Sequence, residues 1–65
     1  MLNYDKLWHI MLDRKIKKSD LCFMSGISSS TMAKLGKNEI VSLEVLEKIC
    51  IVLECDLGDI ASFRE

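Results

Sequence analysis

Residues 21–35 read LCFMSGISSSTMAKL, and the middle of this stretch sets the local structure. Gly26 is a natural helix stop, because the left-handed backbone past a helix end costs glycine little. Ser28 is a good N-cap, since its hydroxyl can accept from backbone N–H groups one turn ahead. The stretch therefore predicts a helix over residues 18–25, a turn with a buried Ile27, and a second helix that starts near Ser28.

Two short helices joined by such a turn form a helix-turn-helix candidate. In that motif the second helix enters the major groove of DNA by its N-terminal residues, while the first crosses the sugar–phosphate backbone. The hydroxyls of Ser29 and Ser30 can meet base edges, and Lys34 can reach a guanine edge or a phosphate. We expect the other lysines near these helices to contact phosphates. The candidate DNA-binding residues are Lys17, Lys18, Ser28, Ser29, Ser30, Thr31, Lys34, Lys37 and Asn38.

The serine run has a plainer interpretation as an N-cap with hydrophilic neighbours, and the lysines as ordinary solvated residues. The distribution of charge favours a polyanionic partner instead. The formal net charge of the whole chain is −1, but residues 1–38 carry +4 and residues 39–65 carry −5. A fold that kept these parts separate would have a basic face and an acidic back.

Apolar residues at helical spacing predict three further helices. They cover residues 4–14, SLEVLEKICIVLE at 42–54 and DLGDIASF at 56–63, and the last two begin with a capping residue. With 65 residues, no proline and 49% apolar residues, the chain is expected to form one all-α domain over residues 1–65, a compact five-helix bundle. The predicted core is Leu7, Ile10, Met11, Leu21, Ile27, Met32, Leu35, Leu43, Leu46, Ile49, Cys50, Leu53, Leu57 and Ile60, with Met24 or Ser25 facing inward beside Leu21.

The sequence lacks the patterns that enzymes and metal sites need. Cys22, Cys50 and Cys55 show no C-x-x-C spacing, and His9 is the single histidine, so we expect no disulfide framework, metal or cofactor. No glycine-rich phosphate loop is present. No apolar run approaches the roughly 18 residues of a membrane span, and the N-terminal stretch lacks a signal-peptide layout. We therefore expect a cytoplasmic protein that is not an enzyme.

LCFMSGISSSTMAKL followed by SLEVLEKICIVLECDLGDI resembles the lambda-repressor-like family (Cro-type, xenobiotic-response-element-like) of bacterial and phage helix-turn-helix regulators. The resemblance extends over residues 6–60. It implies the five-helix fold and a DNA-binding repressor or activator, usually dimeric on a two-fold symmetric operator. It also implies that Lys18 holds a phosphate and that Ser29, Ser30 and Lys34 are the base readers.

We therefore expect a sequence-specific transcriptional regulator, in the first place a repressor, that binds double-stranded DNA and no small molecule. Trp8, Leu12, Phe23 and Phe63 are more apolar side chains than so small a core accommodates, so we expect a homodimer. Ile60 and Phe63 of the C-terminal region, together with Trp8, are expected to contribute to its interface. The alternative is that Trp8 and Phe63 close the bundle. A second interpretation of the function is a protein-interaction module on the same fold, antitoxin-like or an adaptor, which the net acidity favours.

Overall fold

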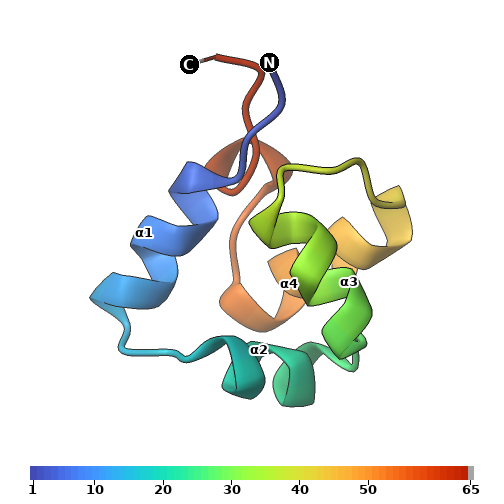
Figure 1. Cartoon of the computed structure of the whole chain (residues 1–65). Coiled ribbons are helices and arrows are strands. Elements are labelled where there is room, and N and C mark those ends of the chain that lie inside the picture. Colours follow the sequence, from blue (N-terminus) through green and yellow to red (C-terminus); the bar gives the residue numbers. More distant parts are fainter. Residues whose placement is uncertain (65) are drawn as a thin grey trace.

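The computed structural model describes residues 1–64 as four α-helices and one short 3-10 turn. The elements are α1 (Asp5–Asp13), α2 (Lys18–Ser25), α3 (Ser29–Gly36), α4 (Leu43–Leu53) and η1 (Leu57–Asp59). The predicted all-α class is confirmed. In Figure 1, α2 lies along the bottom between α1 and α3, α4 runs behind α3, and the two termini meet at the top.

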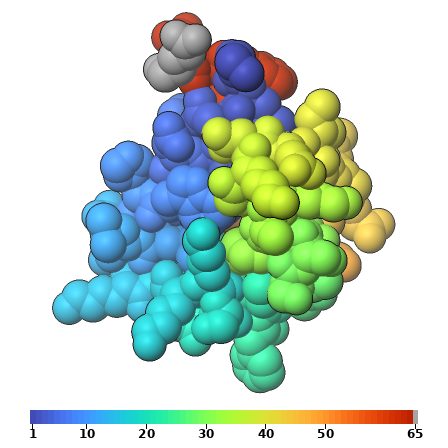
Figure 2. Space-filling model, in the orientation of Figure 1, coloured from blue at the N-terminus to red at the C-terminus, as the bar shows by residue number. Residues whose placement is uncertain are grey.

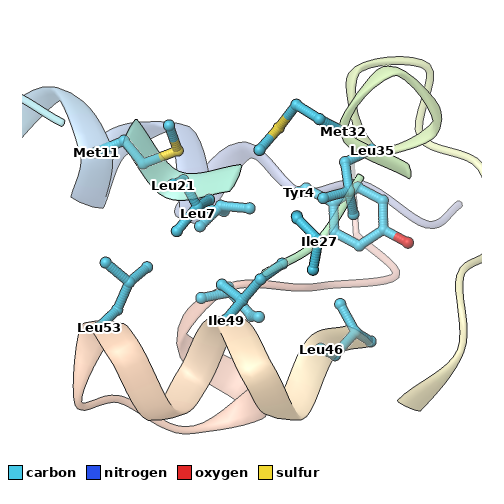
Figure 3. Close-up of a cluster of buried hydrophobic side chains, with 11 residues drawn as sticks. Tyr4, Leu7, Met11, Leu21, Ile27, Met32, Leu35, Leu46, Ile49 and Leu53 are labelled. Carbon is cyan, nitrogen blue, oxygen red and sulfur yellow. The ribbon is translucent and has the colours of Figure 1, made fainter. Parts of the chain in front are cut away.

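The core is a cluster of eleven buried residues to which all four α-helices contribute, as Figure 3 shows. One stripe of α4 supplies Leu46, Ile49 and Leu53 at helical spacing. Leu7 from α1 and Leu21 from α2 lie opposite this stripe and are fully buried. Burying one such side chain contributes roughly 1.5–3 kcal/mol. These five predicted core positions are confirmed.

Five positions differ from the predicted core. Ile10 and Cys50 are half-buried and pack against the core from outside. Leu43 and Leu57 were expected inside, but they are 71% and 42% exposed. Both lie at the first position of their element, beyond the surface that neighbouring elements cover. Tyr4, which the helical spacing did not place in the core, is buried there. Its hydroxyl donates to the backbone carbonyl of Glu39 at 2.7 Å, and desolvation by burial raises the pKa of Tyr4 above its ordinary value.

The predicted fifth helix over residues 56–63 is wrong, because the chain makes only the single turn η1. Ser62 instead pairs with Asn3 in an isolated antiparallel bridge, with N–H···O distances of 2.8 and 3.0 Å in the two directions. A helix cannot continue into a segment that is held extended in this way. Gly58, in the middle of the turn, also has a low helix propensity. The bridge joins the two ends of the chain.

Two cations fasten α1 to the C-terminal half of the chain. The ammonium of Lys6 donates to the carbonyl of Gly58 at 3.0 Å, and the guanidinium of Arg14 donates to the carbonyl of Leu53 at 2.6 Å. Leu53 is the last residue of α4, where the helix dipole favours a positive charge. Lys6 and Arg14 contribute to the positive charge from which a basic face was expected, but their side chains form hydrogen bonds that stabilise the fold. None of the described helices is both long and apolar enough to cross a membrane.

Candidate nucleic-acid interface

The two helices α2 and α3 are joined by a three-residue turn whose geometry follows from its sequence. Gly26 has φ +77°, the left-handed conformation, and its N–H donates to the carbonyl of Cys22 at 2.9 Å. Ile27 is buried in the core below the turn. The turn is thus held by one glycine and one apolar anchor, and the predicted helix-turn-helix is present.

Ser28 is the N-cap of α3, as the sequence predicted. Its hydroxyl oxygen accepts from the backbone N–H of Thr31 at 3.1 Å. The same hydroxyl lies 2.9 Å from the hydroxyl of Ser30 and 3.0 Å from that of Thr31. Ser28 and the half-buried Thr31 are therefore engaged in starting the helix.

One face of α3 is buried in the core and the opposite face is exposed to solvent. Met32 and Leu35, three residues apart, are buried in the core. Four residues on the outward side are exposed, and we call them the reading edge: Ser29, Ser30, Ala33 and Lys34. Within residues 1–64, neither the hydroxyl of Ser29 nor the ammonium of Lys34 has a hydrogen-bond or ion-pair partner. Figure 2 shows this segment, in green, uncovered on the face toward the viewer.

The four remaining candidate residues belong to the start of α2 and to the segment that follows α3. Lys17 and Lys18 begin α2, and the backbone N–H of Lys17 donates to the Asp20 carboxylate at 3.0 Å. Lys37 and Asn38 follow α3, and Asn38 takes the left-handed conformation with φ +58°. All four are exposed, and the ammonium of Lys18 lies beside Gly36, the last residue of α3.

The three residues expected at a dimer interface lie in different environments. Trp8 is half-buried on α1, and the ammonium of Lys18 lies 4.9 Å from the centroid of its ring. Ile60 has no exposed surface, so the expectation that it meets a partner is wrong, because it fills the core beneath η1. Phe63 is 80% exposed and does not close the bundle.

Phe63 lines an apolar groove of about 500 Å³ that the sequence did not indicate. Leu43 of α4 and Ile40, which precedes α4, also line it and are 71% and 85% exposed. A neighbouring hollow shares Leu43 with this groove and adds three carboxylates: Glu44, Glu47 and Asp56. The apolar groove therefore has an acidic rim. Its signal in the sequence is weak, because its members come from separate segments.

The cysteines are half-buried beside the core rather than gathered at the surface. Desolvation raises the pKa of the Cys50 thiol to about 11, with further contributions from the nearby Cys55 and two acidic side chains. A thiol with so high a pKa is largely uncharged at neutral pH and is a poor nucleophile. Among the residues described, no three His, Cys, Asp or Glu side chains come together as metal ligands.

Comparison with known proteins agrees with this geometry. The family model of the Cro/C1-type helix-turn-helix DNA-binding domain matches residues 6–65. YozG, an uncharacterised HTH-type transcriptional regulator of Bacillus subtilis (strain 168), is 35% identical over 57 residues, which are 85% of this chain and 68% of YozG. The crystal structure of the transcriptional regulator VanUg (form II) matches with a TM-score of 0.90 and 54% identity, over 94% of this chain and 81% of VanUg. The resemblance drawn from the sequence is confirmed: the chain belongs to the Cro/C1-type helix-turn-helix DNA-binding family.

Proposed function

We propose that the protein is a transcriptional repressor that reads the major groove of double-stranded DNA with the reading edge of α3. The observation that carries the proposal is the free, short-chained leading edge of this helix next to exposed lysines. A recognition helix enters the groove by its N-terminal residues, so these residues must be free of core packing.

The residues of the reading edge would make the contacts with the bases. The hydroxyls of Ser29 and Ser30 can donate or accept at base edges, so they fit any of the four base pairs weakly. Ala33 can meet the methyl group of a thymine. Lys34 reaches furthest and can donate to the acceptor pair of a guanine. The specificity of this interface therefore depends most on Lys34.

The lysines near α2 and α3 would contact phosphates. Lys17 and Lys18 begin α2, the helix that crosses the DNA backbone in this motif, and Lys37 and Asn38 follow α3. Ser28 and Thr31 support the interface indirectly, since their hydroxyls order the first turn of α3. Such contacts fix the orientation of the protein on the duplex and carry no sequence information.

Repression is the proposed mode because it needs nothing beyond occupancy of the DNA. A protein bound across a promoter excludes the polymerase, whereas an activator must also offer the polymerase a surface. Dimerisation supports such occupancy, since two copies on adjacent half-sites combine their affinities.

The proposed homodimer uses the apolar groove. Phe63, Ile40 and Leu43 are exposed together there, and a contiguous apolar patch on a small protein marks a binding surface. A second copy related by a two-fold axis would place the same side chains against one another. The acidic rim would bring like charges together in that arrangement, so the dimer should tighten as salt screens them.

The same groove supports a second candidate function, a protein-interaction module. An apolar groove with acidic rim residues also suits a segment of another protein with apolar anchors and cationic flanks. The two functions differ in what salt does to DNA binding. Counterion release makes DNA affinity fall steeply with rising salt, and a module that binds only protein shows no such DNA affinity.

The experiment is selection of bound duplexes from a random DNA pool at near-physiological salt, followed by affinity measurements at several salt concentrations. Enrichment of a two-fold symmetric motif, with affinity that falls linearly on a logarithmic salt scale, is the expected result. A pool that shows no enrichment and no salt-dependent retention would refute the proposed DNA binding and leave the interaction module.

A further inference from the structure

Lys18 differs from the other exposed lysines of the interface in having a defined neighbour. Its ammonium nitrogen lies 4.9 Å from the centroid of the Trp8 indole ring on α1. This is within the roughly 6 Å over which a cation is attracted to the face of an aromatic ring. No other described lysine makes such a cation–π contact, and this one connects α1 with α2.

The other side of this ammonium faces the end of α3. A Cβ atom built on Gly36 would lie 3.8 Å from the Lys18 nitrogen, an ordinary van der Waals contact. Residues three and four apart share a face of a helix, so Gly36 lies on the same face as Ala33 and Ser29. The positive charge of Lys18 is therefore fixed beside the face of α3 that carries the reading edge. Figure 2 shows the start of α2, in cyan, between α1 and α3 on one exposed face.

The arrangement leaves the ammonium free to bind an anion. The ion pairs found within residues 1–64 do not include Lys18, and the indole face attracts the cation without accepting all three of its N–H donors. Lys17 and Lys18 together line a hollow of about 560 Å³ next to Trp8 and Gly36. An oxygen of a DNA phosphate at this point would meet two cations.

We infer that Trp8 is a positioning residue for DNA-backbone binding: its indole face holds the Lys18 ammonium beside α3, where the phosphate binds. This inference rests on the proposed function. A lysine side chain otherwise loses much rotamer freedom when it binds a phosphate, and a side chain already held in place loses less. Trp8 thus strengthens DNA binding through Lys18, without touching the DNA itself.

The test is a double-mutant cycle on DNA affinity. Trp8→Leu should weaken binding roughly two- to fivefold, the factor that corresponds to an exposed cation–π contact. In the Lys18→Met background the same change should have no further effect, because the cation is gone. The weakening should be equal for the selected duplex and for a scrambled duplex, since phosphate contacts carry no sequence information. Lys48→Met, on α4 and outside the hollow that Trp8 and Lys18 line, is the matched control for charge loss.

A second readout uses the fact that Trp8 is the single tryptophan of the chain. Its fluorescence should change when the scrambled duplex is added, and the change should disappear in Lys18→Met while persisting in Lys48→Met. This measurement stands even if Trp8→Leu lowers the stability, and Trp8→Phe, which keeps an aromatic face, should recover most of the affinity.

The outcomes separate the two proposals. If the wild-type chain binds no duplex, the proposed function fails. If it binds, but Trp8→Leu costs the same affinity with and without Lys18, or the fluorescence response survives Lys18→Met, then the positioning role of Trp8 is refuted and DNA binding stands.

Discussion

The molecule leaves two surfaces uncovered, and they are opposite in character. The reading edge of α3 with its flanking lysines is polar and cationic, and its side chains project from a helix that is anchored in the core. The apolar groove exposes Phe63, Ile40 and Leu43 and is rimmed with carboxylates. The exposed serines of the reading edge and the apolar groove therefore belong to different parts of the molecule, although Phe23 and Leu12 are also exposed outside the groove.

The difference indicates what each surface binds. Exposed serines and lysines are stable in water and gain from an anion that can replace their hydration. Exposed phenylalanine and isoleucine gain only from a partner that removes water, at roughly 25 cal/mol per Å² of apolar area. DNA fits the first surface and protein fits the second, and salt should act on the two with opposite sign.

The largest expected effect is on the reading edge. Lys34→Gln should weaken binding to the selected duplex by roughly 1–3 kcal/mol and relax specificity at one base pair, because it removes the longest base-directed donor. Fluorescence anisotropy with labelled duplex measures this. The matched control is Lys48→Gln, an exposed lysine of α4 whose ammonium lies 3.9 Å from Glu44. Equal losses for the two variants would show that only overall charge matters.

The next effect is on the groove. Phe63→Ser should weaken the homodimer by about 1–2 kcal/mol. Phe63 is 80% exposed in the monomer, and the substitution removes the apolar surface that the dimer would bury. Phe23→Ser, at a phenylalanine of α2 that is 90% exposed, should leave the dimer intact. Sedimentation equilibrium across salt concentrations measures both variants. A chain that stays monomeric at all concentrations, or a dimer that weakens as salt rises, contradicts the proposed interface.

A smaller effect separates two neighbouring serines within the first surface. Ser28→Ala should lower the free energy of unfolding by about 1 kcal/mol, because it removes the N-cap of α3. Ser29→Ala should change that free energy by less than about 0.5 kcal/mol, while it weakens DNA binding. Urea denaturation together with anisotropy gives both quantities. If Ser29→Ala destabilised the fold as much as Ser28→Ala, the reading edge would not be free.

The smallest expected effect concerns Tyr4, which links α1 to the connection that carries the groove. Tyr4→Phe removes the 2.7 Å hydrogen bond to Glu39 and should cost less than about 1 kcal/mol. The pKa of Tyr4 is raised by folding, so its stabilising contribution is complete below pH 10 and is lost as the pH rises through the folded value. Tyr4→Phe should therefore flatten the alkaline loss of stability.

Part of that alkaline loss should remain in Tyr4→Phe. The pKa of Cys50 is raised to about 11, so it loses its contribution as the pH rises from 9 to that value, with the same sign. Denaturation at neutral pH and at several alkaline pH values measures the two contributions. A wild-type chain whose stability did not fall above pH 9 would contradict both pKa shifts.

Local features of the helix-turn-helix could be predicted from the sequence because they depend on few residues. Gly26 and Ser28 determine the turn by their own conformational preferences, and the spacing of Met32 and Leu35 determines which side of α3 faces outward. The stripe of α4 is long enough to be recognised by its period alone. The uncovered position of the reading edge follows from these local choices.

Other features depend on residues far apart in the sequence. The pairing of Asn3 with Ser62 replaces the expected fifth helix, and no local pattern indicates it. Helical spacing also shows which face is apolar but not where the covering elements end, so Leu43 and Leu57 were not recognised as surface. The contact of Lys18 with Trp8 is likewise tertiary.

The measurement that tests the main claim most directly is an NMR titration of isotope-labelled protein with the selected duplex. We expect the largest amide shift changes in the first turn of α3 and at the start of α2, with little change along the exposed side of α4. Changes centred on α4 and the apolar groove, with α3 unaffected, would contradict the assignment of α3 as the DNA-reading helix.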